Sequence, residues 1–522
     1  MMTAQQTRPP EITLKQLLIG LVSHDYLPDI PVTGLTLDSR EVKSGNIFVA
    51  LEGSREHGLA YAHAAVNNGA TVVLCDRQFD QYCQQMLSAL LTRVVCVAVA
   101  NLRDHLGEIA CRFYGAASRE LFMVGITGTD GKTSVSHFVA QALQDAKHPS
   151  AVIGTIGNGL LNQLQTASHT TPNVIEVHAL LAQLHDAGAT QVAMEVSSHG
   201  LHQNRVAAVD FDVAVLTNLG RDHLDYHGDM DAYRAAKRRL FERPELRALV
   251  LNLDDEFGRQ LATESPGRLE TGRLEIWGYT LLGIRSHDEV QAALEPRVKL
   301  LSASQVRAHS GGLAMHVQSP VGAADLQLDV MGSFNASNVL ATLAVLLQRG
   351  IGFDDAITRL QKLKTVPGRM ETVRVANKAL AVIDYAHTPQ ALASVLTSLR
   401  AHCQGRLICV FGCGGDRDRG KRPLMAAAAE QLADRVIVTD DNPRTENAIT
   451  ISDEIFCGFA KPDAVTLIHD REHAISSALA QARVDDIVLI AGKGHEDYQI
   501  IGNHKRPFSD MQVVKKVLGG VQ

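Results

Sequence analysis

The glycine-rich segment 125–134 combines residue types that bind phosphate. Its letters are GITGTDGKTS, and from Gly125 the spacing G-x5-G-K-T is one residue longer than the usual phosphate-loop spacing. Glycines let backbone N–H groups approach phosphate oxygens, and a helix N-terminus favours negative charge. Lys132 is placed to reach β- and γ-phosphates, and the Thr133 hydroxyl to ligate Mg²⁺. The predicted phosphate-binding residues are Gly128, Thr129, Asp130, Gly131, Lys132, Thr133 and Ser134.

The sequence on either side of this loop supports a nucleotide site. The apolar run LFMVGIT (121–127) is typical of a strand buried on both faces of a parallel sheet, and a helix-like stretch follows the loop. A glycine-rich turn with an isolated lysine is the alternative. The strand–loop–helix order favours the phosphate loop.

A carboxylate and an imidazole follow two further predicted strands, QVAMEVSS (191–198) and FDVAVLTNL (211–219). Ligands bind at the carboxyl edge of doubly wound sheets, so Glu195 could hold a Mg²⁺ that bridges the phosphates. A solvated glutamate at a strand end is the alternative for Glu195 taken alone. In the loop TNLGRDHLDYHG (217–228), His223 is our candidate for a second metal ligand.

Lys237 lies in YRAAKRRLF, whose pattern predicts a helix. Two arginines follow it directly, so on local sequence alone it is expected to be an ordinary surface lysine. A functional role for this residue needs evidence from outside the helix.

The elements that must position these residues form an α/β chain of about three domains, since domains contain roughly 100–200 residues. Residues 1–100 contain short strands (35–40, 46–51, 71–75) and a helix (60–70). Residues 101–364 form a longer α/β series around the phosphate loop. Residues 365–522 follow a Pro- and Gly-containing linker (366–370), with strands predicted at 379–386, 406–415, 434–441 and 485–494.

Composition narrows the class of protein. The chain has 522 residues, of which 45% are hydrophobic and 20% charged, with a net charge of −7 and a pI of about 6.3. These values argue against a nucleic-acid binder that depends on a basic surface. The eight cysteines lack metal-site spacing and are expected to be free thiols in a reducing compartment. We see neither a signal peptide nor a membrane span, so we expect a cytoplasmic protein.

Taken together, the motifs resemble the Mur ligases of bacterial cell-wall synthesis. The segments that carry the resemblance are LTLDSR, GITGTDGKTS, HTTPN, MEVSSHGL, TNLGRDHLDYHG, YRAAKRRLF, GSFNASN, VPGRME, DYAHTPQAL, FGCGGDRDRGKRP, TDDNPR and AGKGHE. They run in order from residue 35 to residue 496. The resemblance implies three domains: a small N-terminal α/β UDP-binding domain, a central P-loop-type ATPase domain with a parallel-rich sheet, and a Rossmann-like C-terminal domain that binds the amino acid.

The resemblance also implies a reaction. ATP would phosphorylate the D-glutamate carboxyl group of UDP-N-acetylmuramoyl-L-alanyl-D-glutamate, and the amine of an incoming amino acid would attack the acyl-phosphate. ATP and Mg²⁺ are the implied cofactors, small molecules the implied partners, and a monomer the expected state. Lys237 matches a lysine that the family carbamylates, which turns a cation into a carboxylate-like group. The implied catalytic or metal-ligating residues are Lys132, Thr133, Glu195, His223 and Lys237.

Further positions carry over from the family motifs. Those expected at the nucleotide are Asn335, Asn338, Arg369, Asp384 and His387. Those expected at the muramoyl dipeptide are Leu37, Ser39, Ser54, Thr170, Thr171, Ser197, Gln203 and Arg205. Two positions depart from the family pattern, because Asp130 and His169 both stand where the family more often has asparagine. A carboxylate at position 130 is mildly repulsive to a triphosphate.

The segment TDDNPR (439–444) predicts which amino acid is added. It resembles the form of the motif in enzymes that use meso-2,6-diaminopimelate, which differs from lysine by a distal carboxylate. Arg444 can bind that carboxylate in a two-pronged ion pair, but would repel the ammonium of lysine. The other expected amino-acid contacts are Arg417, Asp441, Asn442, Pro443, Gly492 and Glu496.

Three alternatives stay open from sequence: a lysine-adding ligase, a folylpolyglutamate synthetase, and a phosphate-loop nucleotide sensor without ligase chemistry. The TDDNPR motif disfavours the first. The N-terminal LTLDSR segment disfavours the second, and the combination of Lys237, Arg369 and the amino-acid pocket disfavours the third.

Overall fold

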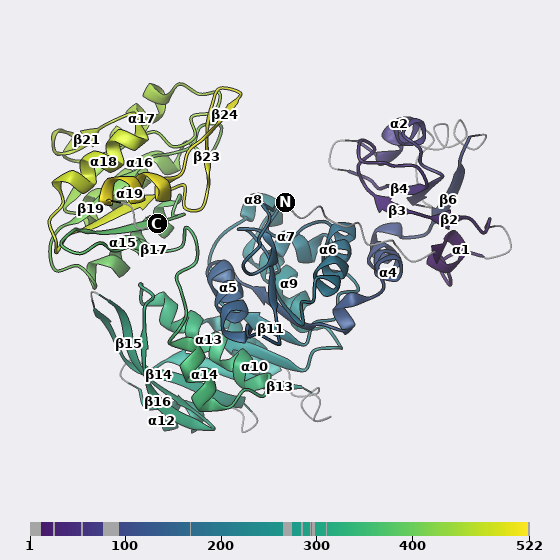
Figure 1. Cartoon of the computed structure of the whole chain (residues 1–522), viewed down its shortest axis with the longest axis horizontal. Helices are drawn as coiled ribbons and strands as arrows, with labels where there is room; N and C mark the ends of the chain where they lie inside the picture. Colours follow the sequence, from purple (N-terminus) through teal and green to yellow (C-terminus); the bar gives the residue numbers. More distant parts are fainter. Residues whose placement is uncertain are drawn as a thin grey trace. The chain divides into compact units, whose positions relative to one another are not determined.

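The computed structural model describes residues 12–23, 27–53, 56–76, 93–167, 169–264, 274–282, 285–292, 294, 298–309 and 311–519. The chain divides into two compact units. The first contains residues 1–132, 143–251 and 255–276, and the second contains residues 133–142, 252–254 and 277–522. Figure 1 identifies the elements of both units by label and colour.

A small parallel sheet opens the first unit, with strand order β3-β4-β5-β6. Successive residues of β4 alternate between two apolar clusters, Ile47 and Val49 in one, Phe48 and Ala50 in the other. Both sheet faces are therefore buried. The elements are β1 (Ile12–Thr13), α1 (Leu14–Leu17), β2 (Pro31–Val32), β3 (Gly34–Thr36), β4 (Asn46–Ala50), α2 (Ala62–Asn67), β5 (Val72–Asp76), β6 (Val95–Val99) and α4 (Leu102–Tyr114).

Two predicted elements of this region are shorter than expected. The strand expected at 35–40 ends at Thr36, because the Asp38 backbone N–H binds the Thr36 hydroxyl at 3.0 Å and the Arg40 N–H binds Asp38 Oδ1 at 2.9 Å. These side-chain bonds form a turn in place of a sheet ladder. The helix expected at 60–70 begins as a 3₁₀ turn and is α-helical only from Ala62 to Asn67.

The central sheet of the first unit carries the phosphate loop. Its strands lie in the order β12-β11-β7-β10-β8-β9, and β7 is parallel to both neighbours. In register, Glu195 lies opposite Ile126 and Leu216 opposite Thr127, so three carboxyl ends meet at one edge. The strands are β7 (Phe122–Thr127), β8 (Ser150–Ile153), β9 (Asn158–Leu160), β10 (Gln191–Glu195), β11 (Val213–Leu216) and β12 (Ala248–Asn252).

Side-chain caps fix where three helices of this region begin. Asn173 Oδ1 accepts from the Glu176 N–H at 3.0 Å, Ser197 Oγ from Gly200 at 3.0 Å, and Asp229 Oδ1 from Ala232 at 2.8 Å. The helices of this region within the first unit are α6 (Val174–Asp186), α7 (Ser198–His202), α8 (Leu224–His227), α9 (Met230–Phe241) and α10 (Glu256–Glu264). The helix after the phosphate loop, α5 (Lys132–Leu143), has residues 133–142 in the second unit.

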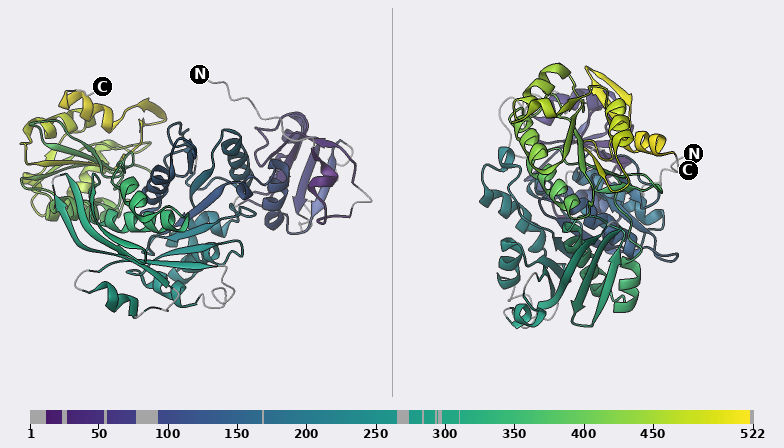
Figure 2. Two further views of the ribbon diagram at one scale, coloured as in Figure 1. Left: turned by 60° about the horizontal axis from the view of Figure 1, so that its bottom comes forward. Right: turned by 90° about the vertical axis from the view of Figure 1, so that its left-hand side faces the viewer.

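The second unit contains an antiparallel region and a parallel-rich region. The antiparallel strands β14–β16 are long and twisted (Figure 2). The elements of this region are β13 (Glu275–Leu281), α12 (His287–Ala292), β14 (Val298–His309), β15 (Gly312–Ser319), β16 (Gly322–Leu328), α13 (Phe334–Gln348) and α14 (Phe353–Leu360).

A six-stranded sheet, in the order β17-β18-β22-β19-β20-β21, organises the C-terminal part of that unit. Leu407, Cys409 and Phe411 of β19 enter one apolar cluster and Ile408 and Val410 enter another, so helices cover both faces. The elements are β17 (Glu371–Val373), β18 (Leu380–Asp384), α15 (Pro389–Arg400), β19 (Leu407–Phe411), α16 (Lys421–Leu432), β20 (Arg435–Val438), α17 (Ala448–Phe456), β21 (Thr466–Leu467), α18 (Arg471–Gln481), β22 (Ile487–Ala491), β23 (Tyr498–Ile501), β24 (His504–Pro507) and α19 (Asp510–Leu518).

The cysteines and the helix lengths bear on two expectations, free thiols and no membrane span. The seven cysteines among the described residues are free, as expected. Within the same residues, no helix has the length and apolarity needed to cross a bilayer.

Candidate active site

The phosphate loop is held in shape by the segment that follows β11. The Thr129 N–H donates to the Asn218 carbonyl at 3.0 Å, and the Asp130 N–H to Asn218 Oδ1 at 2.9 Å. The Thr217 hydroxyl donates to the Asp130 carbonyl at 2.6 Å. Lys132 Nζ donates to the Gly128 carbonyl at 3.0 Å and the Thr129 carbonyl at 2.9 Å. The loop is therefore preformed, with its lysine folded back across it.

Asp130, the departure from the family pattern, takes part in this frame through its backbone. Both its N–H and its carbonyl are bound by the segment after β11, while its side chain is exposed. The position therefore depends on main-chain groups that asparagine and aspartate share.

We expect Gly128→Ala to weaken nucleotide binding at least ~10-fold. Gly128 has φ +153°, and an added Cβ would lie 1.8 Å from Thr217 Oγ1, so the loop must shift. Backbone strain of this kind costs about 1–3 kcal/mol, and 1.4 kcal/mol is tenfold in affinity. Titration calorimetry with ADP measures the change. The control is Gly352→Ala, where an added Cβ meets nothing within 4 Å; equal affinities for both variants would contradict the prediction.

Glu195 at the end of β10 is fully buried, so the alternative of a solvated glutamate is wrong. Its Oε1 accepts from the Thr155 N–H at 2.8 Å and its Oε2 from the Thr155 hydroxyl at 3.1 Å. A Cβ on Gly154 would lie 2.2 Å from Oε1, so glycine is what admits the carboxylate here. Its location beside the end of β7 suits a Mg²⁺ ligand, and that role stays a prediction.

The residues expected at the muramoyl dipeptide form one hydrogen-bond network with Glu195. The Thr170 and Thr155 hydroxyls lie 3.0 Å apart, and the Thr171 hydroxyl donates to the Glu195 carbonyl at 2.9 Å. Arg205 Nη1 donates to the Thr171 carbonyl at 2.8 Å. Two further bonds extend the network, from the Ser197 N–H to Thr171 Oγ1 and from Arg205 to Gln203 Oε1.

The other residues predicted to bind the muramoyl dipeptide lie elsewhere in the first unit. Leu37 and Ser39 follow β3, where the Ser39 carbonyl accepts from Asn68 at 2.9 Å. His169 is exposed beside the Thr170–Thr171 pair. Ser54 lies outside the described residues, so its predicted contact is untested.

Lys237 is 1% exposed, so the surface lysine expected from local sequence is wrong. Its Nζ donates to the Gly128 carbonyl at 2.7 Å and lies 4.6 Å from the ring centroid of Tyr233. Burial, and then the neighbouring Lys132 cation, hold the pKa of Lys237 well below its ordinary value. This pKa favours a neutral, nucleophilic amine beside the phosphate loop.

His223 is exposed and lies among aromatic side chains. Its ring centroid is 4.8 Å from that of His199 and 6.2 Å from that of Tyr233. Tyr233 in turn links to the phosphate loop, since its hydroxyl is 3.1 Å from Thr129 Oγ1. Burial and then the nearby histidines lower the pKa of His199 to about 4.

The described residues include no group of three or more His, Cys, Asp or Glu side chains placed to hold a metal ion. Mg²⁺ at nucleotide sites does not require one, because it commonly takes one or two carboxylates with phosphate oxygens and water. A buried Glu195 and a buried amine that can become a carbamate fit that donor set.

In the second unit, the residues expected at the nucleotide are tied into local structure. Asn338 Nδ2 donates to Asn335 Oδ1 at 2.8 Å, and Asn335 Nδ2 to the Met331 carbonyl at 2.7 Å. Asp384 accepts from the N–H groups of Met370 and Ala386 at 2.8 and 2.7 Å. Burial raises the pKa of Asp384.

Arg369 lies near His137 and His495 in the same unit. Its guanidinium lies 5.0 Å from the ring centroid of Tyr385. Burial, followed by Arg369 and His495, lowers the pKa of His137 to about 4. Within the described part of the chain, Arg369 Nε, His137 Nε2 and His495 Nδ1 are buried without a hydrogen-bond partner. These unpaired polar atoms suit a polar ligand.

The expected amino-acid pocket is formed by loops after β19, β20 and β22. Arg444 has φ +53°, and its Nη1 donates to the Gly415 carbonyl at 2.8 Å. Asn442 Nδ2 donates to Glu496 Oε2 at 2.9 Å, and the Asn442 N–H to Asp441 Oδ1 at 2.7 Å. The carbonyl of Pro443 accepts from Glu446, Gly492 adjoins Asp441, and Arg417 is exposed.

The hairpin β23–β24 supports this pocket from one side. Gln499 Nε2 donates to the Asp441 carbonyl at 2.6 Å, and the Ile500 N–H to Asn442 Oδ1 at 2.9 Å. The Arg444 N–H donates to the Ile500 carbonyl at 3.1 Å. The hairpin therefore holds Arg444 in its positive-φ conformation.

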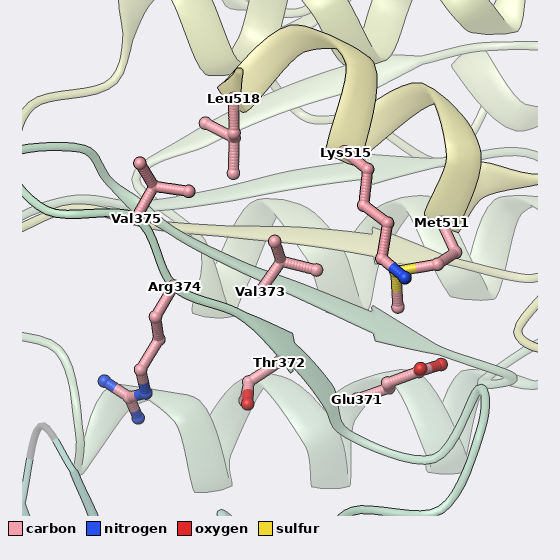
Figure 3. A pocket seen from close by; sticks show the side chains of 8 residues that line it. All are labelled: Glu371, Thr372, Val373, Arg374, Val375, Met511, Lys515 and Leu518. Carbon is pink, nitrogen blue, oxygen red and sulfur yellow. The ribbon is translucent and has the colours of Figure 1, made fainter. Parts of the chain in front are cut away.

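A separate cavity of about 300 Å³ lies between β17 and α19. In Figure 3, Lys515 and Met511 extend from α19 towards the strand that carries Glu371. Burial raises the pKa of Glu371, whose carboxylate accepts from the Gly368 N–H at 2.8 Å. The lining residues are Glu371, Thr372, Val373, Arg374, Val375, Met511, Lys515 and Leu518, none of them a predicted site residue.

Several residues of the site were not predicted from the sequence. Thr217 and Asn218 lie inside the motif TNLGRDHLDYHG, and Lys493 lies inside AGKGHE. Their positions inside these motifs could have identified them as site residues. Thr155 and His137 had no such signal, because their partners are distant in the chain.

Three family models match the chain. The Mur ligase family catalytic domain matches residues 31–114, the Mur ligase middle domain residues 126–346, and the Mur ligase glutamate ligase domain residues 368–494. Together they cover more than half of the sequence.

Similar proteins include ligases from Coxiella burnetii and Pseudomonas aeruginosa, each 45% identical over 490 residues, or 94% of this chain and 96% of theirs. Both are named UDP-N-acetylmuramoyl-L-alanyl-D-glutamate–2,6-diaminopimelate ligase. A solved structure of a ligase with that name has a TM-score of 0.70 and 34% identity, covering 97% of this chain and 99% of that chain. A folylpolyglutamate synthase structure from Mycobacterium tuberculosis, 18% identical with a TM-score of 0.59 over 80% of this chain and 95% of that chain, shares the fold alone. This chain belongs to the Mur ligase family and has its three-domain α/β fold.

Proposed function

We propose that this chain catalyses the ATP-dependent addition of meso-2,6-diaminopimelate to UDP-N-acetylmuramoyl-L-alanyl-D-glutamate in peptidoglycan precursor synthesis. The observation that carries the choice of acceptor is the Arg444 guanidinium, which binds the Gly415 carbonyl. Asp441 and Asn442 lie in the same loop, and Asn442 binds Glu496 of a neighbouring loop. The names of relatives at 45% identity over nearly the full chain support the same substrates.

The reaction has two steps: the carboxyl group is first phosphorylated, and the acyl-phosphate is then attacked by an amine. The D-glutamate carboxylate attacks the γ-phosphorus of ATP, and ADP leaves. The acceptor amine then attacks the acyl-phosphate carbonyl, phosphate departs, and the amine loses a proton. An amide, ADP and phosphate result.

The first step depends on residues at the edge of the central sheet. Backbone N–H groups of the phosphate loop and the Lys132 ammonium bind the nucleotide phosphates. Thr133, Glu195, His223 and carbamylated Lys237 would hold Mg²⁺, which neutralises charge on the phosphates. Glu195 is already fixed by Thr155, so little reorganisation is needed there.

The second step depends on the acceptor pocket. Arg444 binds the distal carboxylate of the acceptor, and Asp441 and Glu496 lie near its ammonium groups. This arrangement presents one amine and rejects lysine, which lacks the distal carboxylate.

A phosphate-release assay with UDP-N-acetylmuramoyl-L-alanyl-D-glutamate and ATP tests the proposal. We expect release to require meso-diaminopimelate, with kcat/KM exceeding that for L-lysine by roughly 10- to 150-fold, since hydrogen bonds to charged groups contribute about 1.5–3 kcal/mol. Reactions without acceptor or without dipeptide are the controls. Equal use of lysine, or no release with either acceptor, would contradict the proposal.

We also propose domain boundaries near residues 100 and 364, a monomeric state and a cytoplasmic location. The gap between the matched segments 126–346 and 368–494 supports the boundary near residue 364, whereas the matched segment 31–114 runs past residue 100. The free cysteines suit a reducing compartment.

A further inference from the structure

Lys493, in the loop after β22, is fully buried. Lysine is rarely buried completely unless its ammonium group is paired. Here Nζ donates to Glu496 Oε2 at 2.9 Å and to Asn442 Oδ1 at 3.2 Å, and it lies 5.5 Å from the ring centroid of Tyr498. Both hydrogen-bond partners belong to the proposed acceptor pocket.

The contacts of Lys493 set the orientation of the Asn442 side chain. Asn442 Oδ1 accepts from two groups that can only donate, the Lys493 ammonium and the Ile500 N–H. The amide nitrogen must therefore point the other way, where it donates to Glu496 Oε2 at 2.9 Å. Without the ammonium group, one of the two constraints on this amide is lost.

Lys493 also offsets the negative charge of the carboxylates in the acceptor pocket. Glu496 and Asp441 both lie near enough to Tyr385 to raise the pKa of its hydroxyl, after the larger effect of burial. Two carboxylates in one pocket repel each other, and a buried charge is costly unless it is paired. A fixed cation between Asn442 and Glu496 keeps the Glu496 carboxylate in place.

Resting on the function proposed above, we propose that Lys493 is the positioning residue of the acceptor pocket. It fixes the Asn442 amide and one oxygen of the Glu496 carboxylate, and so orients the carboxylate that lies near an ammonium group of the amino acid. Lys493 acts through these neighbours, and the phosphate loop does not depend on it.

The test is Lys493→Met, which keeps an unbranched side chain of similar length and removes the charge. We expect the KM for meso-diaminopimelate to rise about 10-fold or more, as for loss of charged hydrogen bonds. The KM for ATP and for the muramoyl dipeptide should stay within about twofold of wild type. Because the side chain is buried, melting temperature and ADP affinity are measured on the same preparations.

Two further variants make the result specific. Lys516→Met removes another lysine–glutamate pair of the C-terminal region, with Glu472 at 2.7 Å, and should leave all three KM values unchanged. Lys493→Ala, which leaves room for a small cation, should regain part of its acceptor use with methylammonium. Wild type measured in parallel separates the two proposals, because a wild type that ignores meso-diaminopimelate refutes the function itself.

An unchanged KM for meso-diaminopimelate in Lys493→Met would overturn the positioning role. So would a parallel rise in all three KM values with a lowered melting temperature, because that pattern means general destabilisation. A selective rise in the acceptor KM, with ADP affinity preserved, supports the role.

Discussion

Replacing Lys237 with alanine is expected to lower kcat about 100-fold or more, because a metal ligand contributes several kcal/mol of transition-state stabilisation. Lys237 is buried, and its amine contacts the Gly128 carbonyl of the phosphate loop. Since its pKa is lowered, the amine is deprotonated at a lower pH than a surface lysine. Only a neutral amine can attack CO₂, so this environment favours the carbamate.

Short carboxylates should partly restore activity to Lys237→Ala, because acetate or bicarbonate can occupy the place of the carbamate. Initial rates with and without additive measure the rescue. The control is Arg238→Ala on the same helix, an exposed-face arginine paired with Glu242 and Glu264, which should keep near wild-type turnover. Full turnover of Lys237→Ala without additive would count against carbamylation.

Arg444→Ala is expected to reduce kcat/KM for meso-diaminopimelate about 10- to 150-fold, the range that corresponds to losing about 1.5–3 kcal/mol of charged hydrogen bonding. Alanine meets the same φ of +53° that arginine adopts, so the backbone strain is common to both proteins. Affinity for ADP should persist, because the phosphate loop is a separate structure. Acceptor kinetics and ADP titration on one preparation measure both effects.

Two more variants define what Arg444 contributes. Arg444→Lys keeps the positive charge but lacks the planar fork, so it should recover only part of the loss. Arg483→Ala removes an exposed arginine of the same domain and should behave as wild type. Unchanged kinetics for meso-diaminopimelate in Arg444→Ala would refute the assignment of the acceptor pocket.

The sheet strands could be predicted because each one is a short apolar run bounded by polar or glycine residues. The runs at 121–127 and 406–415 became β7 and β19, both buried on two faces. The strand predicted at 35–40 was too long, because the Asp38 side chain closes a turn directly after β3. Such turns depend on side-chain geometry that a hydropathy pattern does not contain.

The sequence by itself determined the phosphate loop, since strand, glycines, lysine and helix are contiguous and fold locally. It also determined the family and the acceptor motif, through ordered segments along nearly the whole chain. Only the tertiary structure decided that Lys237 and Glu195 are buried, and that Lys493 orients Asn442 and Glu496. Burial and pairing follow from contacts such as Lys237–Gly128, which joins residues 109 positions apart, and local sequence cannot specify such contacts.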